Sequence, residues 1–335
     1  MSIGRTTAPG RATTCEDSDE QPSLALVIAF SGAQPHRIGE IAFFTLGQWV
    51  FLGRGDTELE KFVHFAQQRP GQIFAVDPRD GILEGKTLSK RQLRLRFVGD
   101  GIEVENIGKC RMYISGRECQ RGVLRPGDTL RLRDELVLLC VSRPRVLPKL
   151  QAEGPLHPFG EADEFGIVGE SEAAYLMRAQ IKSAAKGNDH VLIHGETGTG
   201  KELVAAAIHR RSSRGNVPWV PRNAGISTST LIQSELFGNP AGYPNPGMPA
   251  RPGLLGEAHR RTLFFDEIGD CPEDVQVQLL RVLQLGEYQQ QGEVVVRHVD
   301  VRFLGATNKP DSVFRKDFLA RFTKHVRLVP LRERR

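Results

Sequence analysis

The spacing of apolar residues changes once along the chain, near its middle. From Leu24 to about Val141, short apolar or alternating runs are separated by turn residues, which is typical of an all-β sandwich. From Ile167 onward, apolar runs alternate with stretches of helical spacing, which predicts a mostly parallel sheet with helices on both faces. We therefore expect a multidomain protein in which an all-β sandwich is followed by a three-layer α/β core.

Individual elements follow from the same pattern. In the first half we expect strands at 24–28, 93–97, 102–105, 130–133 and 136–139. In the second half we expect helices at 173–185, 201–212, 229–237 and 272–285, and strands at 190–194, 219–220, 262–266 and 299–307. Val275, Leu279, Val282 and Leu283 fall on one face of the last helix, as core residues would.

Composition shifts mark the domain boundaries. Residues 1–22 are polar and aperiodic, so we expect a disordered N-terminus, followed by the β-sandwich at 23–143. Residues 144–165 are rich in proline and glycine and are interpreted as a linker. The α/β domain is expected at 166–335.

A glycine-rich segment follows the apolar run 191–193 and opens a helical pattern. Glycines in such a loop let the backbone turn its N–H groups toward a phosphate, and Lys201 would add positive charge. A merely flexible turn would require the flanking strand, lysine and helix to be coincidental. The expected nucleotide contacts are Gly195, Glu196, Thr197, Gly198, Thr199, Gly200, Lys201 and Glu202.

A second apolar run, 262–265, ends in two carboxylates. Asp266 is expected to hold Mg²⁺, because Glu202 stands where many phosphate loops carry a metal-binding hydroxyl, and Glu267 is expected to orient the attacking water. Alone, this pattern fits an apolar strand with a solvated acidic end equally well. Together with the glycine loop it favours a site for ATP and Mg²⁺.

Charge and cysteine content restrict the possible functions less than the glycine loop and the two carboxylates do. The chain has 335 residues, 39% of them hydrophobic, and a net charge of +5, which permits nucleic acid or acidic partners without requiring them. Five scattered cysteines lack the spacing of a zinc site or a disulfide framework. No apolar run is long enough for a membrane span or an export signal, so we expect a cytoplasmic protein without a membrane partner.

Parts of the first half resemble the forkhead-associated (FHA) family, which binds phosphothreonine. The resemblance rests on Gly53-Arg54, on 88–92 and on Asn106-Ile107-Gly108. It implies that Arg54 and Ser89 hold the phosphate, with Lys90 adding charge. Gln92 replaces the family's structural histidine, and 109–111 replaces its Ser-x-Asn segment. A basic loop on an ordinary sandwich is the alternative.

The second half resembles the AAA+ domain of bacterial enhancer-binding proteins, which activate RNA polymerase with sigma-54. The segments that carry the resemblance are 167–171, 195–202, 235–238, 262–269, 279–284, 306–308 and 331–334. Glu202 is this family's usual residue after the lysine. The resemblance thus implies a P-loop ATPase fold, and hydrolysis of ATP to ADP and phosphate.

The same resemblance implies roles for four polar residues. Asn223 would restrain Glu267, and Asn308 would be the polar sensor beside the phosphates. Arg315 and Arg321 would reach the nucleotide of a neighbouring subunit, so hydrolysis would require a homo-oligomeric ring. Without the motif context, these arginines would be interpreted as a solvated helix face.

Two departures from the family bear on function. The family's Gly-Ala-Phe-Thr-Gly-Ala loop, which contacts sigma-54, is replaced by residues 242–247, and Pro244 and Pro246 restrict this loop. The sequence given stops at Arg335, where the family continues into a helical lid and a DNA-binding helix-turn-helix; we therefore expect weakened nucleotide binding and no direct DNA contact.

Two functions fit these features. The first is a cytoplasmic ATP-binding transcription regulator with a phosphothreonine-sensing input. The second is a non-catalytic phosphopeptide-binding adaptor or decoy with a nucleotide-sensing AAA+ scaffold.

Overall fold

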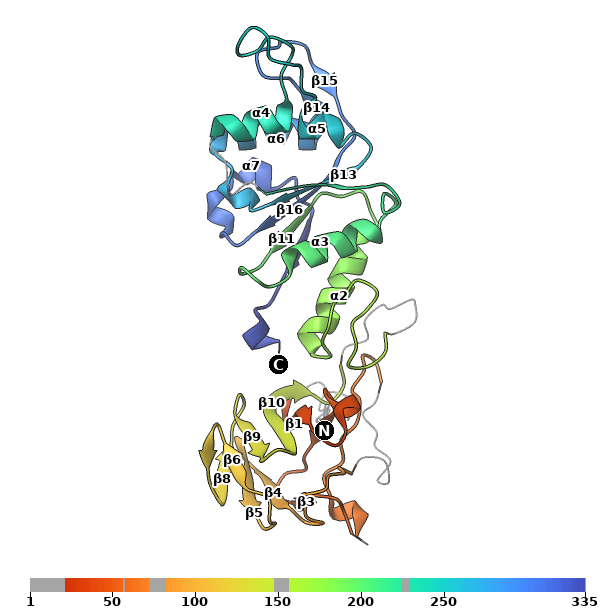
Figure 1. The fold of residues 1–335 in the computed structure, drawn as a ribbon, viewed down its shortest axis with the longest axis vertical. Coiled ribbons are helices and arrows are strands. Elements are labelled where there is room, and N and C mark those ends of the chain that lie inside the picture. Colours follow the sequence, from red (N-terminus) through yellow and green to blue (C-terminus); the bar gives the residue numbers. More distant parts are fainter. Residues whose placement is uncertain (1–21, 57, 73–81, 148–156, 224–228, 335) are drawn as a thin grey trace, which may run out of the picture. The chain divides into compact units, whose positions relative to one another are not determined.

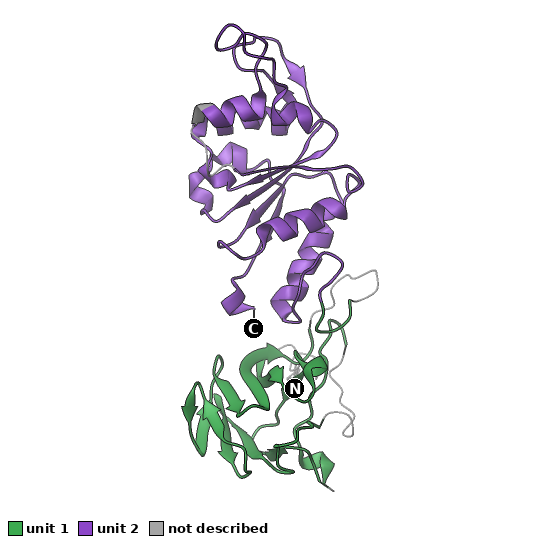
Figure 2. Cartoon of the chain, viewed as in Figure 1, with its two compact units in different colours: residues 1–161 green, residues 162–335 purple. Residues whose placement is uncertain are grey.

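The chain folds into two compact units. The computed structural model describes residues 22–56, 58–72, 82–147, 157–223 and 229–334, with only the backbone described at 229 and 230. Unit 1 comprises residues 1–161 and unit 2 residues 162–335 (Figures 1 and 2). The N-terminal segment expected to be disordered lies outside the described residues except for Pro22, which begins the first strand.

Unit 1 is a sandwich of two antiparallel sheets, which confirms the predicted all-β fold. The six-stranded sheet has the order β2-β1-β10-β9-β6-β7, and the four-stranded sheet has the order β3-β4-β5-β8. The strands of the first sheet are β1 (Pro22–Ser31), β2 (Ile41–Phe43), β6 (Met112–Ile114), β7 (Arg117–Glu118), β9 (Thr129–Leu132) and β10 (Leu136–Pro144). Those of the second are β3 (Trp49–Leu52), β4 (Leu93–Val98), β5 (Gly101–Asn106) and β8 (Arg121–Leu124).

Alternation along β4 shows how the sequence builds this sandwich. Leu93 and Leu95 point into the core and are completely buried, whereas Arg94 and Arg96 point outward. The two guanidinium groups lie over the Trp49 ring, each 4.7 Å from its centroid. Each buried leucine contributes about 1.5–3 kcal/mol, so a register shift of one residue would be strongly unfavourable.

Unit 2 is an α/β fold around one parallel sheet with the order β12-β13-β16-β11-β17. Its strands are β11 (Val191–His194), β12 (Val220–Asn223), β13 (Thr262–Asp266), β16 (Arg302–Thr307) and β17 (Lys324–Arg327). Its helices are α2 (Glu172–Ala185), α3 (Lys201–Arg210), α4 (Ser229–Phe237), α5 (Gly253–Glu257), α6 (Glu273–Leu285) and α7 (Lys316–Leu319). A short hairpin joins β14 (Glu287–Tyr288) to β15 (Arg297–His298).

Helices cover both faces of this sheet, as predicted. One core packs side chains of α2 and α3 against β11, and a second packs α4, α5, α6 and α7 against β13 and β16. Neighbouring residues of β13 divide between these cores, because Phe264 belongs to the first and Phe265 to the second. This two-sided burial explains the continuous apolar run in β13.

The element boundaries differ from the predictions where polar residues enter strands. The strand expected at 219–220 runs over Val220–Asn223, and the one expected from 299 begins at Arg302. Arg302 is fully buried and donates to Ala184 O (2.6 Å) at the end of α2 and to Asp189 O (3.2 Å). Strand β17, helix α5 and the β14–β15 hairpin were not predicted. None of the helices in the described ranges combines the length and apolar character needed to cross a membrane.

Candidate functional site

The polar residues predicted in unit 2 gather where the parallel strands end. Asn223 pairs in register with Asp266, and His194, the last residue of β11, pairs with Thr307. Ligands of open parallel sheets bind outside the carboxyl ends of the strands. This edge of the sheet is therefore the expected place for a ligand, and the glycine-rich loop begins there.

The loop between β11 and α3 has the backbone of a phosphate cradle. Gly198 and Gly200 have φ angles of +82° and +89°, and a Cβ atom at either position would meet no atom within 4 Å. The space beside their backbone is thus open. Gly200 is also the N-cap of α3, whose first N–H groups have no partner within the helix.

The side chain of Lys201 folds back onto this loop. Its side chain is buried, and Nζ donates to Gly195 O at 3.1 Å. The same Nζ lies 3.5 Å from Glu267 Oε1. Glu267 follows β13 with a φ of +52°, a conformation that is uncommon outside glycine. Its Oε2 is buried and has no hydrogen-bond partner among the described atoms.

Asp266, Asn223 and Asn308 border the same space. Asp266 Oδ1 accepts a hydrogen bond from Glu267 N (2.9 Å), and its Oδ2 accepts one from Asn223 Nδ2 (3.5 Å). Asn308 Nδ2 donates to Thr197 Oγ1 in the glycine loop (3.3 Å). The structure therefore brings together the loop, both carboxylates and both asparagines.

Two arginines near the end of the chain also contact the loop, and neither was predicted to be a site residue. Arg332 forms a bidentate ion pair with Glu196, with two N–O distances of 2.7 Å. This hydrogen-bonded partner lowers the pKa of the Glu196 carboxyl. Arg334 Nη2 donates to Thr199 O (2.8 Å). The only sequence signal was the similarity of 331–334 to the AAA+ family.

Arg315 and Arg321, unlike Arg332 and Arg334, have no described contact with the glycine loop. Arg315 forms ion pairs with Glu273 (3.0 Å) and Asp317 (2.9 Å) of its own chain. Arg321 is half-buried, and its Nε has no hydrogen-bond partner among the described atoms. No described contact joins either arginine to the glycine loop of this chain.

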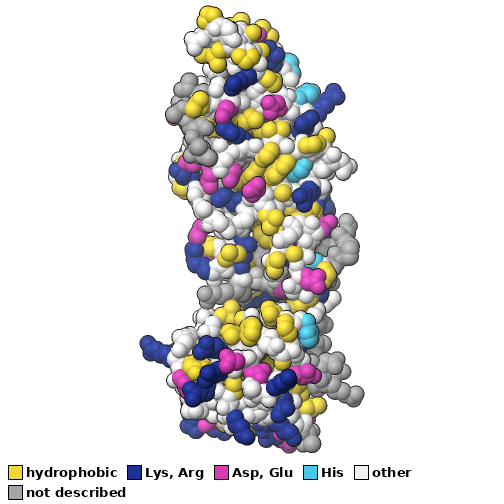
Figure 3. All heavy atoms as spheres, viewed as in Figure 1, with side chains coloured by type: hydrophobic (Ala, Val, Ile, Leu, Met, Phe, Trp, Pro, Cys, Tyr) yellow, Lys and Arg dark blue, Asp and Glu magenta, His cyan; other side chains and the backbone are white. Residues whose placement is uncertain are grey.

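The proline-containing loop is firmly held. Asn239 Nδ2 donates to three carbonyl oxygens, those of Pro240, Tyr243 and Pro249. The Tyr243 ring lies against Gly292, where a Cβ atom would come within 2.3 Å of its Cδ2. Hydrophobic side chains gather on this tip of unit 2 (Figure 3), and Val294, Val295 and Val296 are 89%, 54% and 42% exposed.

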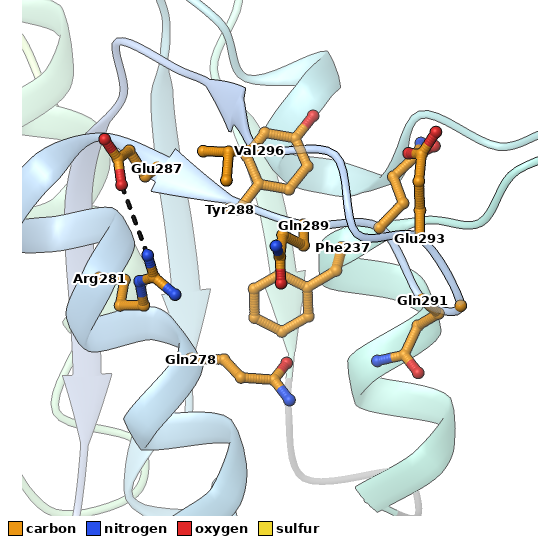
Figure 4. Close-up of a pocket in the computed structure, with 11 residues that line it drawn as sticks. Phe237, Gln278, Arg281, Glu287, Tyr288, Gln289, Gln291, Glu293 and Val296 are labelled. Carbon is orange, nitrogen blue, oxygen red and sulfur yellow. Dashed lines mark ion pairs between the residues drawn. The ribbon is translucent and has the colours of Figure 1, made fainter.

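A pocket of about 250 Å³ adjoins these valines, and Val296 is one of the residues that line it. Phe237, at the end of α4, points into it, and amide side chains of α6 and of the segment after β14 surround the ring (Figure 4). An ion pair between Arg281 and Glu287 (3.6 Å) borders one side. None of the residues that line this pocket belongs to the glycine loop.

In unit 1, the predicted phosphate-binding residues lie on adjoining loops. Arg54 N donates to Ser89 O (3.2 Å), and Gly55 N donates to Lys90 O (3.2 Å). A Cβ atom on Gly53 would come within 2.2 Å of Lys90 O, so only glycine allows this approach. Arg54 and Lys90 are exposed.

Gln92 joins these loops to a third one. It is fully buried, and its Oε1 accepts hydrogen bonds from Ser89 N (3.2 Å) and Cys110 N (3.3 Å). Its Nε2 donates to Asn106 Oδ1 (2.7 Å) and to Cys110 O (3.0 Å). One amide group thus orders the segments that carry Ser89 and residues 106–111.

Comparisons with known proteins agree with the geometry of unit 2. A family model described as the sigma-54 interaction domain matches residues 167–329. The formate hydrogenlyase transcriptional activator FhlA of Escherichia coli K12 is 41% identical over 179 residues, which cover 51% of this chain and 26% of FhlA. The chain therefore spans about a quarter of that relative's length.

Solved structures overlap with each half of the chain separately. NtrX from Brucella abortus in complex with ATP is 35% identical and covers 50% of this chain and 37% of its own, with a TM-score of 0.45. The FhaA FHA domain is 18% identical and covers 35% of this chain and 99% of its own, with a TM-score of 0.25. On the evidence of the family match and the relatives' identity, residues 167–329 of this chain are a sigma-54 interaction domain.

Proposed function

We propose that this chain is an ATP-binding transcription regulator of the sigma-54 activator type, with a phosphothreonine-sensing input in unit 1. The observation that carries the nucleotide part is the buried Lys201, whose Nζ lies between the glycine loop and Glu267. A buried cation facing an open loop of backbone N–H groups is an arrangement suited to a polyphosphate.

The residues around this loop fit ATP and Mg²⁺. The buried, unpartnered Oε2 of Glu267 supports the fit, since a carboxylate oxygen of this kind needs a water or a cation. Asp266 would hold the metal, and Glu267 would orient the attacking water once the phosphates replace it as the partner of Lys201. Bound Mg²⁺ would neutralise charge that develops on the phosphates.

Hydrolysis in this proposal depends on neighbouring copies. Asn308 contacts the glycine loop and Asn223 contacts Asp266 in this chain, whereas no described contact joins Arg315 or Arg321 to that loop. Both arginines would act on the nucleotide of an adjacent subunit in a ring. Sigma-54 in RNA polymerase would be the partner, in keeping with the relatives' description as transcriptional activators.

The input in unit 1 would be a phosphorylated protein. Arg54, Ser89 and Lys90 present a guanidinium group, a hydroxyl and an ammonium group on loops that are hydrogen-bonded to each other. These groups suit a phosphothreonine.

A nucleotide-binding assay tests the first part. Replacing Lys201 by Ala should abolish ATP binding in titration calorimetry, whereas replacing the exposed Lys186 should leave it unchanged. Full affinity in the Lys201 variant would contradict the assignment.

A second function is favoured by the proline-containing loop at 242–247. If this loop fails to engage sigma-54, the chain would be a phosphopeptide-binding adaptor or decoy that binds ATP without turnover. A steady-state ATPase assay at rising protein concentration separates the two functions. Turnover per subunit that climbs with concentration supports the ring, and negligible turnover at every concentration supports the adaptor.

A further inference from the structure

The loop end of unit 1 carries more positive charge than a single phosphate requires. Lys109 and Arg111 lie on the third loop that Gln92 orders, and both are exposed. The Lys109 backbone N–H donates to Ser89 Oγ at 3.1 Å. The backbone of Lys109 therefore lies directly beside the Ser89 hydroxyl, which is proposed to hold the phosphate.

The local backbone directs both cations outward. Cys110, between them, is buried, with its Sγ 3.4 Å from Arg133 O and its N–H bonded to Gln92 Oε1. Since this residue is anchored inward, the side chains before and after it extend into solvent. The hydrogen bonds of Cys110 thus fix the backbone positions of Lys109 and Arg111.

Several carboxylates near these loops already have partners. Glu135, whose charge acts on Cys110, accepts hydrogen bonds from Thr87 N (2.8 Å) and Thr87 Oγ1 (2.6 Å). Asp56 and Glu58 form ion pairs with Arg91 at 2.6 and 2.8 Å. Glu118 lies 3.7 Å from Arg111, and both side chains are more than half exposed, so this pair is weak. Among the described side chains, none forms an ion pair with Lys90 or Lys109. The excess charge is therefore available to a ligand.

We propose that this surface selects phosphothreonine ligands that carry a second anionic group beside the phosphothreonine, and that Lys109 and Arg111 recognise that group. The inference rests on the proposed phosphothreonine function and names its ligand class. The second group would be an Asp or Glu carboxylate or another phosphate. Residues 109–111 would then contribute selectivity through charge.

Peptide binding to the full chain, followed by fluorescence anisotropy, tests this selectivity. The phosphothreonine peptides would have neutral flanks, Glu flanks or a neighbouring phosphoserine, and a Glu-flanked peptide without phosphate would accompany them. We expect the two doubly anionic ligands to bind about tenfold more tightly than the neutral one, since each exposed ion pair adds about two- to fivefold. The advantage should shrink as the salt concentration rises.

Variants assign the effect to residues. Lys109→Gln with Arg111→Gln should remove the preference while keeping affinity for the neutral phosphopeptide, and Arg54→Ala should weaken all phosphopeptides. Arg125→Gln is the matched control, because Arg125 pairs with Asp100 before β5, whereas the site adjoins Asn106 at that strand's other end. Trp49 fluorescence would verify that each variant is folded.

Each result is decisive. Equal affinity for neutral and doubly anionic phosphopeptides would overturn the selectivity while leaving the phosphothreonine function intact. No binding of any phosphopeptide, or no effect of Arg54→Ala, would overturn both. Equally tight binding of the unphosphorylated Glu peptide would show a general polyanion surface and would also overturn the proposal.

Discussion

A single buried amide organises the candidate site of unit 1. Gln92 occupies the position at which the FHA resemblance expects histidine, and its side chain makes four hydrogen bonds to residues 89, 106 and 110. A Cβ atom on Gly108 would come within 2.4 Å of its Oε1, so the third loop packs directly on the amide. The substitution therefore preserves a structural connection between the loops.

Replacing Gln92 by Ala should destabilise unit 1 by at least about 2 kcal/mol, because buried groups such as Cys110 N–H lose their partner. Urea denaturation followed by Trp49 fluorescence measures this change, since Trp49 lies on β3 of the same unit. Gln120→Ala, at an exposed position, is the control and should change stability little. An equally small effect of both substitutions would show that the Gln92 amide does not hold the loops.

Buried and half-buried histidines should make unit 2 sensitive to acid. Burial lowers the pKa of His190, His194 and His209 below the usual value. His190 Nδ1 accepts from Phe303 N (3.1 Å), and its Nε2 lies 3.3 Å from Leu283 O, which fixes the neutral form. The unfolded chain thus binds more protons than the folded one just below pH about 6.5.

The stability contributed by these neutral histidines is complete above their unfolded pKa and is lost as the pH falls through and below it. Urea midpoints of unit 2, followed by Trp219 fluorescence at several pH values, should therefore decrease on acidification. His190→Gln should make that decrease shallower, whatever its effect at neutral pH. An unchanged slope would show that His190 does not contribute.

At the level of elements, apolar periodicity predicted most of the structure. Strand β13 begins and ends as expected at 262 and 266, and helices α2 and α4 deviate by at most one residue. Strand β17 escaped prediction because only Val326 in Lys324–Arg327 is apolar, and the neighbouring β11 supplies the rest of its pairing. Local pattern cannot reveal a strand that depends on its neighbour.

The glycine loop was predictable because its spacing fixes local chemistry, whereas its long-range contacts were not. The pairing of Arg332 with Glu196 joins residues far apart in the sequence, and nothing local to either residue indicates it. Likewise, the sequence showed that Gln92 stands in place of the FHA family's histidine, but it did not show that the Gln92 amide contacts Cys110. Such contacts are set by topology.

The contact between Tyr243 and Gly292 should keep the loop at 239–251 fixed to the hairpin of β14 and β15. Gly292→Ala would force the Tyr243 ring away, and the hydrogen-bonded backbone amides of Asn239, Gly242 and Arg251 should then exchange their hydrogens with solvent more quickly. Gly247→Ala is the matched control, because Gly247 also has a positive φ (+90°) but open space at its Cβ. Equal exchange rates in the two variants would attribute any effect to backbone strain alone.

For the whole molecule, the two units have separate cores and separate reporters. Trp49 lies in unit 1 and Trp219 in unit 2, and these are the only two tryptophans in the sequence. Burial raises the pKa of Cys140 and Cys271 to about 12, so neither thiol should react while its unit is folded. With Trp49→Phe or Trp219→Phe in the intact chain, the remaining tryptophan therefore follows one unit at a time.

This separation allows ATP binding to be assigned to one unit. A ligand that binds only the folded state stabilises it by about 2.7 kcal/mol at a hundredfold excess over its Kd. ATP with Mg²⁺ should therefore shift the Trp219 transition to higher urea concentration and leave the Trp49 transition in place. Lys201→Ala should abolish the shift and Lys186→Ala should keep it. If neither transition moved, the glycine loop would not be a nucleotide site; if both moved together, the units would unfold as one, contrary to their separate cores.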